Sequence, residues 1–330
     1  PRDLQVDVAD VVARPGVEHV AQRCVGVPVP DGGGDRGLDG GLGVLPGQPG
    51  PPGDELPGGV VVPGEQRRLL GRVGDPLVVG VAELGGYPMV VDGNLAQIGT
   101  RESIADVARV VGRQVSAIVW RTHGQDRLQE MADHVDVPVV NALTDDYHPC
   151  QILADLLTVT EHKGSVAGLK VAYVGDAANN MAHSYLLGFA TAGANIVVAG
   201  PESYQPNPQI LEDAQRIAAQ TGGSATASTD AVVAVSDADV VITDTWVSMG
   251  QEGEKAERQG ETNPFRSFAV TADLMAHAKA DAIVMHCLPA YRGYEIAADV
   301  IDGPQSVVWD EAENRLHAQK ALLAFLLERS

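Results

Sequence analysis

The residues most suited to chemistry are the run His148, Pro149, Cys150 and Gln151, which follows a short apolar segment and opens a helical one. Proline fits the first turn of a helix, where its missing N–H costs nothing. The unpaired backbone N–H groups of that turn attract anions. His148 and Gln151 are therefore placed to hold a phosphate or a polarised carbonyl group. An ordinary capped helix explains the same four residues equally well, because such short motifs also arise by chance.

Other polar residues come directly after apolar segments that read as strands. Arg121 follows one that ends at Trp120, where a cation can meet an anion, although a lone Arg is more typical of a surface charge. Asn179 and Asn180 stand at the start of a helix and suit a carboxylate, or equally a helix cap. Asp244 follows another strand and suits an ammonium group. Each of these residues is ambiguous when it is considered alone.

His286 and Cys287 end a further predicted strand. Cys287 could act as a nucleophile, with His286 as the neighbouring base. Successive side chains of a strand point to opposite faces, so we expect His286 to face away from Cys287. A packing or lining role for Cys287 is equally consistent. Gln97 in a polar loop and Arg315 on the last helix read, by themselves, as surface residues.

Strands and helices alternate from Val78 onward, which predicts an α/β protein with parallel sheets. Ligands of such folds bind at the carboxyl ends of the strands, where Arg121, Asp244 and Cys287 stand. The predicted strands are 88–91, 117–120, 137–140, 169–174, 195–199, 240–243 and 283–286. The predicted helices are 103–113, 125–134, 149–162, 180–192, 207–220, 229–235, 271–278 and 311–329.

Composition excludes several classes of function. A net charge of −21 argues against a nucleic acid or an anionic membrane as partner. No apolar run approaches the roughly 18 residues of a membrane span, and no signal peptide is visible. Cys24, Cys150 and Cys287 form no CxxC pair that would suggest zinc. So sparse and odd a set of cysteines indicates reduced thiols and a cytoplasmic setting.

Residues 1–77 differ in composition from the rest of the chain. They contain no Ser, Thr, Asn, Lys or aromatic residue, and 28 of them are Gly or Pro, far above ordinary usage. One interpretation is a disordered extension. The other is a shifted or antisense reading frame of a GC-rich gene, because every residue type here except Cys24 has codons that begin with G or C. We favour the second interpretation, which the coding DNA would test.

Together these motifs resemble the ornithine carbamoyltransferases, within the aspartate/ornithine carbamoyltransferase family. The resemblance runs in order from Val78 to Ser330. Its motifs are Gln97-Ile98-Gly99, Arg121, His148-Pro149-Cys150-Gln151, Gly175-Asp176, Asn179-Asn180-Met181, Asp244 with Trp246-Val247-Ser248-Met249-Gly250, His286-Cys287-Leu288-Pro289-Ala290 and Glu313-Asn314-Arg315. The 244–250 loop is similar to that of the branch that uses ornithine, rather than aspartate, as the acceptor.

The resemblance implies two Rossmann-like domains with parallel sheets, of which the N-terminal domain is incomplete here. Residues 78–147 would form the remainder of a carbamoyl-phosphate domain, and residues 148–310 an ornithine-binding domain. Residues 311–330 would be a C-terminal helix that returns to the first domain. The resemblance also implies a homotrimer with active sites between subunits, a role in arginine biosynthesis, and neither metal nor cofactor.

The same resemblance assigns roles to residues, of which Arg121, His148, Asp244 and Cys287 would be catalytic. The residues that would bind carbamoyl phosphate are Gln97, Arg121, His148, Gln151, Cys287, Leu288 and Arg315. Those that would bind ornithine are Asn180, Asp244, Ser248 and Met249. The neutral δ-amine of ornithine would attack the carbamoyl carbon while the arginines stabilise the departing phosphate. Citrulline and phosphate would result; Tyr291 and Tyr294 receive no role.

The chain departs from the family just before Val78. The family has a phosphate loop, Ser-Thr-Arg-Thr-Arg, where this chain has Gly71-Arg72-Val73-Gly74-Asp75-Pro76. Two arginines are missing, and each lost charge-assisted hydrogen bond costs about 1.5–3 kcal/mol. We therefore expect little or no transferase activity. Because the first strand and helices of that domain are missing too, we also expect an exposed sheet edge and a final helix without its docking partner.

Two other functions stay open. The acceptor half is complete while the phosphate loop is not, which favours a non-catalytic ornithine-binding or regulatory relative. A carbamoyltransferase for an amine such as putrescine is a weaker alternative. Putrescine has neither the α-ammonium group that Asp244 would meet nor the α-carboxylate that Asn180 would meet.

Overall fold

The structure is a computed structural model that describes residues 76–91, 96–247, 253, 257–258, 260 and 262–328. The interpretations of residues 1–77 as disordered or frame-shifted therefore concern a segment that lies, except for its last two residues, outside the described part. Within the described part, no helix is both long and apolar enough to cross a membrane.

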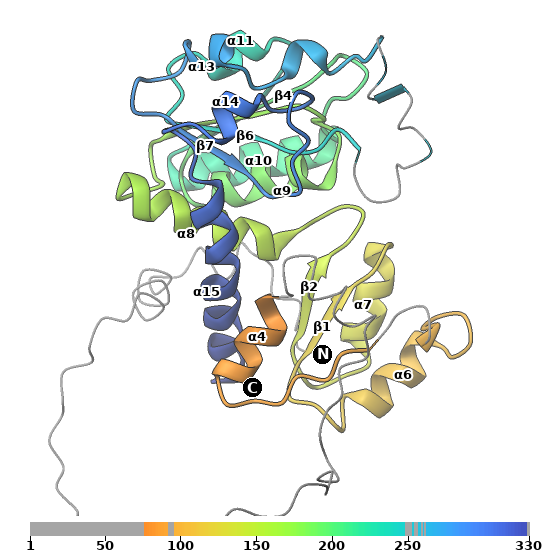
Figure 1. Ribbon diagram of the computed structural model, residues 1–330. Coiled ribbons are helices and arrows are strands. Elements are labelled where there is room, and N and C mark those ends of the chain that lie inside the picture. Colours follow the sequence, from red (N-terminus) through yellow and green to blue (C-terminus); the bar gives the residue numbers. More distant parts are fainter. Residues whose placement is uncertain are drawn as a thin grey trace, which may run out of the picture.

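The described chain forms two α/β units, each built on a parallel sheet (Figure 1). The first sheet has two strands and the second has five, in the order β5-β4-β3-β6-β7. The strands are β1 (Ile118–Arg121), β2 (Val139–Leu143), β3 (Lys170–Val174), β4 (Asn195–Ala199), β5 (Ser224–Ser228), β6 (Val240–Thr243) and β7 (Ile283–His286). The prediction of an α/β protein with parallel sheets is confirmed.

Helices cover both faces of these sheets. The helices are α4 (Pro76–Glu83), α6 (Ile104–Val111), α7 (Gln125–Asp133), α8 (Pro149–Lys163), α9 (Asn180–Thr191), α10 (Pro208–Thr221), α11 (Ala231–Val235), α13 (Ala272–Met275), α14 (Ala298–Ile301) and α15 (Val308–Leu327), with a 3-10 turn η2 (Arg266–Phe268). Several begin where the sequence predicts a cap. Ser103 accepts a hydrogen bond from the N–H of Asp106, and Asn179 accepts one from that of Ala182.

The order of the five-stranded sheet reverses between β3 and β6. From β3 the chain proceeds through β4 to β5 on one side, and β6 and β7 then lie on the other side. In an open α/β sheet such a reversal leaves a crevice at the carboxyl ends of the two central strands. Gly175 and Asp176 follow β3, and Asp244 follows β6. The topology therefore brings these polar residues to one edge.

Alternate residues of the central strands enter two different cores. Tyr173 of β3 and Ile242 of β6 pack on one face with α8, α9 and α10. Ala172 and Val241 pack on the other face with α11, α13 and α14. The small sheet is divided in the same way, because Val139 packs toward α6 and α7 whereas Val140 packs toward α8 and α15.

Helices α8 and α15 join the two units. Ile152 of α8 belongs to the large core, and Cys150 packs with Leu322 of α15 against the small sheet. Figure 1 shows α15 running from the large sheet down to α4 beside the small one. There, Nζ of Lys320 lies 2.5 Å from Oε2 of Glu83. The expectation that the final helix lacks a docking partner is wrong, because both α8 and α4 pack against it.

Several predicted boundaries also need correction. Residues 88–91 form no strand, and Met89 and Val90 are exposed, because an apolar run becomes a strand only where a neighbouring strand accepts its hydrogen bonds. Strand β5 was not predicted, since Ser224–Ser228 is polar and lies at the edge of the sheet. Among the described residues β1 pairs with β2 alone, which agrees with the expected open sheet edge.

The packing of α9 on α8 predicts that Gly188→Ala destabilises the protein. A Cβ atom at Gly188 would collide with Cγ2 of Ile152, and such overpacking costs about 1–3 kcal/mol. Urea denaturation followed by circular dichroism measures the free energy of unfolding. The same change should cost clearly less in an Ile152→Ala background, where the space is vacated. An equal cost in both backgrounds would contradict this packing.

Candidate active site

His148 lies at the mouth of α8, in the N-cap position. Its backbone N–H donates to Oγ of Ser184 on α9 at 2.8 Å, which fixes the first turn of α8 against the large sheet's helices. The imidazole is buried, and its Nδ1 has no hydrogen-bond partner among the described residues. Burial, followed by the charges of Arg315 and Arg121, holds the pKa of His148 well below its ordinary value. The ring is therefore neutral at physiological pH.

Gln151 and Arg315 meet one turn further along α8. Nη1 of Arg315 donates to Oε1 of the buried Gln151 at 2.9 Å. Arg121 is the last residue of β1 and is exposed. Because Arg121 and Arg315 both act on the pKa of His148, the structure gathers two guanidinium groups and one neutral imidazole around the start of a helix. That arrangement suits a phosphate or another anion.

Gln97 lies apart from the other residues that the resemblance assigns to carbamoyl phosphate. It is exposed and has a positive φ of 48°. The carbonyl of the next residue, Ile98, accepts a hydrogen bond from Nη2 of Arg127 at 2.6 Å. Nε of Arg127 also donates to Thr122, directly after β1, at 3.1 Å. The Gln97 loop is thus tied to the end of β1, but the described contacts do not join it to Gln151 or Arg315.

The two asparagines at the mouth of α9 have different tasks. Asn179 caps the helix, and its Nδ2 donates to the hydroxyl of Tyr173 at 3.1 Å. Nδ2 of Asn180 donates instead to the carbonyl of Thr144, in the loop before α8, at 3.0 Å. The carbonyl of Asn180 accepts from Ser184, which also holds the backbone of His148. Asn180 is therefore joined through the hydroxyl group of Ser184 to His148, and so to the residues predicted to bind carbamoyl phosphate, here called the donor side.

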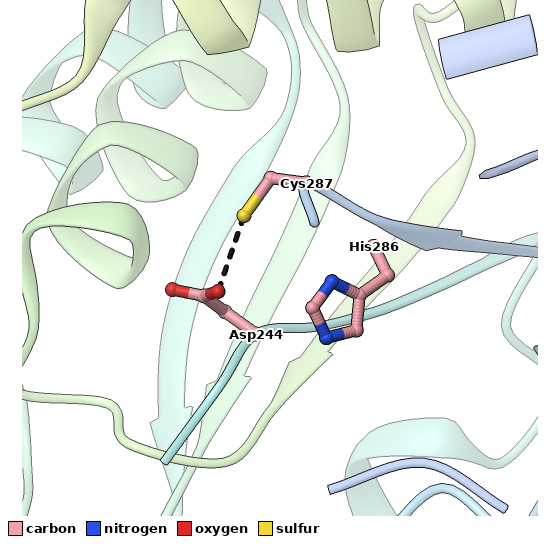
Figure 2. A group of neighbouring side chains, drawn as sticks. All are labelled: Asp244, His286 and Cys287. Atoms are coloured by element: carbon pink, nitrogen blue, oxygen red, sulfur yellow. Dashed lines mark hydrogen bonds between the residues drawn. The ribbon is translucent and has the colours of Figure 1, made fainter. Parts of the chain in front are cut away.

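Asp244 and Cys287 face each other at the ends of β6 and β7 (Figure 2). The thiol of Cys287 donates to Oδ1 of Asp244 at 3.1 Å, and the N–H of Thr245 donates to the same oxygen at 2.7 Å. Asp244 is buried, and burial raises the pKa of its carboxyl group, against the opposing effect of His286. A buried carboxylate at the strand ends gives an ammonium group a strong partner.

The ring of His286 is fully engaged and does not serve Cys287 as a base. Its Nδ1 accepts from the N–H of Leu288 at 2.9 Å, which leaves the proton on Nε2, 3.3 Å from Glu295. Burial, followed by the negative charge of Asp244, raises the pKa of the Cys287 thiol well above its ordinary value. A lining role for Cys287 thus fits the geometry better than a nucleophilic one.

His286 and Cys287 come close together at the end of β7, although Cys287 packs against the core on the α8 and α9 face and the next residue, Leu288, packs against the opposite core. One ring nitrogen of His286, the sulfur of Cys287 and a carboxylate oxygen of Asp244 all lie within 4.8 Å of one another. Cys287 stands past the last residue of β7, and Leu288 has a φ of 57°. The alternation of side chains therefore continues through Cys287 and Leu288, as the sequence predicts, and it does not prevent the thiol and the ring from coming close.

These three groups are donors that could in principle hold a metal ion, but their chemistry does not fit one as arranged. A metal binds the thiolate and a free imidazole nitrogen. Here the Cys287 thiol keeps its proton, and both nitrogens of His286 already have partners. Cys287 is hydrogen-bonded to Asp244 instead, and His286 to Leu288 and Glu295.

The remaining predicted site residues are located as follows. Leu288 is half-buried and packs against the core on the α11 and α13 face. Tyr291 and Tyr294 are exposed. Ser248 and Met249 lie outside the described residues, so their assignment to ornithine stays a prediction.

The sequence did not predict a buried ion pair that lies beside the residues assigned to ornithine, here called the acceptor side. Nη1 of Arg258 lies 2.6 Å from Oδ2 of Asp176, and it also donates to the carbonyl of Trp246 at 3.1 Å. The guanidinium group stands over the ring of Tyr204, 4.9 Å from its centre. Arg258 occurs in a polar loop that the sequence gives no reason to bury. The one available signal is the Gly175-Asp176 pair after β3, whose charge requires a partner at a buried strand end.

Two family models match the chain, one for each of its two α/β units. The family model for the carbamoyl-P binding domain of aspartate/ornithine carbamoyltransferase matches residues 77–161. The model for the Asp/Orn binding domain of the same family matches residues 167–326. Together the two matches cover nearly the whole range over which the motifs resemble that family, and they confirm the resemblance.

Individual relatives agree with these models. The ornithine carbamoyltransferase of Bifidobacterium longum subsp. infantis is 62% identical over 251 residues, which are 75% of this chain and 77% of the relative. That of Clavibacter sepedonicus is 61% identical over 252 residues, 76% and 81% of the two chains. The solved ornithine carbamoyltransferase of Pyrococcus furiosus has a TM-score of 0.75 and 48% identity, over 79% of this chain and 82% of that one.

The raised thiol pKa predicts that Cys287 resists alkylation at neutral pH. Burial and Asp244 keep the thiol protonated, whereas a cysteine in an unfolded peptide has a pKa of about 8.5. Mass spectrometry after treatment with iodoacetamide should show Cys287 reacting far more slowly in the folded protein than in urea. Asp244→Asn, which removes the repelling charge, should speed the reaction. Equal rates in the folded and unfolded protein would contradict this assignment.

Proposed function

The chain belongs to the aspartate/ornithine carbamoyltransferase family, and from that premise we propose its reaction. It transfers the carbamoyl group of carbamoyl phosphate to the δ-amine of L-ornithine, giving L-citrulline and phosphate. One observation carries the proposal. A cationic cluster at the mouth of α8 is joined through Ser184 to Asn180 at the mouth of α9, and the buried carboxyl group of Asp244 lies at the carboxyl end of β6. A phosphate-bearing donor requires positive charge, whereas the ammonium group of a diamino acid requires a carboxylate.

On the donor side, Arg121 and Arg315 would meet the phosphate together with the N–H groups of the first turn of α8. Gln151, held by Arg315, and His148 would face the carbamoyl group. Because its pKa is lowered, His148 stays neutral and can donate one N–H to the carbamoyl oxygen without bringing a positive charge. That hydrogen bond strengthens as the oxygen becomes negative in the transition state.

On the acceptor side, Asp244 would hold the α-ammonium group of ornithine and Asn180 its α-carboxylate, with Ser248 and Met249 beside them. These contacts hold the α-carbon end of ornithine and leave its neutral δ-amine free to attack the carbamoyl carbon. A bond forms between the δ-nitrogen and that carbon, and the bond from carbon to the phosphate oxygen breaks. The δ-nitrogen gives its proton to the departing phosphate, whose charge the arginines stabilise.

We further propose that the reaction is strongly impaired in this chain. The residues before Val78 read Gly71-Arg72-Val73-Gly74-Asp75-Pro76 in place of Ser-Thr-Arg-Thr-Arg. Only Arg72 offers a cation there, and Asp75 adds a charge that repels phosphate. The donor side therefore depends on the α8 mouth, Arg121 and Arg315 alone.

The assembly and the pathway are part of the same proposal. The family resemblance favours a homotrimer that works in arginine biosynthesis in the cytoplasm, with a division between donor and acceptor domains near residue 148. Sedimentation velocity of the purified chain would test the assembly.

A direct comparison tests the impairment. Under identical conditions, citrulline formation by this chain should be about 100-fold or more slower than by the Bifidobacterium longum enzyme, since two missing arginine contacts of about 1.5–3 kcal/mol each correspond to that loss. Turnover within tenfold of the relative would contradict the impairment. Ornithine binding with no turnover at any donor concentration would favour the non-catalytic alternative.

Substitution of Asp244 tests the acceptor assignment. Asp244→Asn removes the charge that would hold the α-ammonium group and should weaken ornithine binding about tenfold to 100-fold. Titration calorimetry in the presence of carbamoyl phosphate measures the affinity. Glu313→Gln, an equal change of charge at an exposed position on α15, serves as the control. If Asp244→Asn left ornithine binding unchanged, and if putrescine binding also survived the change, this role of Asp244 would be contradicted.

A further inference from the structure

Two carboxyl groups are fully buried behind the donor side, and the proposed reaction does not use them. Asp155 lies on α8 and Glu311 on α15, and neither is exposed to solvent. Nε2 of Gln151 donates to both, at 2.8 Å to Oδ1 of Asp155 and at 3.2 Å to Oε1 of Glu311. One amide nitrogen thus stands between two acids from different helices.

One further side-chain oxygen of Gln151 and one of Glu311 each accept another hydrogen bond. Oε1 of Gln151 accepts from Arg315, so the two carboxyl groups decide which end of the amide faces the guanidinium group. Oε2 of Glu311 accepts from the backbone N–H of His286 at 2.8 Å. His286 directly precedes the turn that carries Cys287 and Leu288. Glu311 therefore joins the first turn of α8 to the end of β7.

Two ionised carboxylates could not share this dry space. The groups that act on the pair from the surrounding elements are Arg315, Tyr185, His286 and Cys287, of which only Arg315 has a permanent positive charge. Burial raises the pKa of Asp155 to about 6. Burial, followed by the charge of Asp155, raises that of Glu311 well above its ordinary value. Near neutral pH the pair therefore retains one proton, which relieves the repulsion.

We propose, on the basis of the function proposed above, that Asp155 and Glu311 are a pair of positioning residues for the donor side. Together they hold the amide of Gln151 toward Arg315 and anchor the backbone before Cys287 and Leu288. Neither residue touches a substrate. Their contribution is to keep groups from α8, α15 and β7 in one arrangement before carbamoyl phosphate binds.

Variants of Glu311 separate positioning from mere packing. Glu311→Gln keeps the shape, keeps an acceptor for the N–H of His286, and replaces the shared proton by an amide hydrogen. Glu311→Ala removes both contacts. By calorimetry, Glu311→Ala should weaken carbamoyl phosphate binding about tenfold or more, while Glu311→Gln stays within about threefold of the wild type. Asp155→Asn should behave as Glu311→Gln does, and Glu313→Gln is the surface control.

A second readout needs no substrate. Glu311→Ala should release the turn after His286 and so increase the rate at which iodoacetamide labels Cys287, whereas Glu311→Gln should restore the slow rate. Thermal unfolding establishes that each variant is folded. Equal labelling of Cys287 in the wild type and in a folded Glu311→Ala variant would overturn the proposal, and so would equal loss in the Gln and Ala variants.

Infrared spectroscopy tests the shared proton itself. The wild type at neutral pH should show the carbonyl stretch of a protonated, buried carboxyl group, and Glu311→Gln, which removes the acid whose pKa is raised further, should lack it. Absence of that band from the wild type would overturn the shared proton. If the wild type binds no carbamoyl phosphate, the proposed function fails, yet the labelling and infrared results still decide whether the pair positions the turn.

Discussion

The packing of α15 against α8 is the contact on which the rest of the site depends. Helix α8 presents His148 and Gln151 in its first turn, and α15 crosses it so that Arg315 reaches Gln151. The same two helices contribute to the core against the small sheet, while Ile152 of α8 enters the core of the large one. A displacement of either helix would therefore separate the cations of the donor side from the strand ends that carry Asp244 and Cys287.

The local charge of the proposed site is opposite to the net charge of the whole chain. The net charge of −21 repels an anionic donor at long range. The described donor side counters it locally, with Arg121 and Arg315 beside a neutral His148 at the positive end of a helix. Behind them, burial keeps one proton on the pair formed by Asp155 and Glu311, both of which would be charged in water. Uncompensated negative charge is thus kept away from the proposed phosphate position.

The sequence predicted the regular elements well where local signals were strong. Caps at Ser103 and Asn179, and apolar runs such as 169–174 and 240–243, correspond to observed helices and strands. Motifs also identified residues that the fold brings together, such as Asp244 with Cys287. The failures are of tertiary origin. Residues 88–91 have an apolar run without a neighbouring strand, and the edge strand β5 is too polar to be recognised. The buried pair Asp155–Glu311 could not be predicted, since 155 residues of chain lie between the two acids and only the fold reveals that their helices cross.

The central claim is that donor and acceptor groups line one continuous site. Binding of a single compound that joins a phosphonoacetyl group to the δ-nitrogen of ornithine tests this most directly, because it must contact both sides at once. Calorimetry should show that it binds more tightly than ornithine alone, and that both Arg315→Ala and Asp244→Asn weaken it about tenfold or more. Affinity no better than that of ornithine, or an affinity that depends on only one of the two residues, would contradict the account.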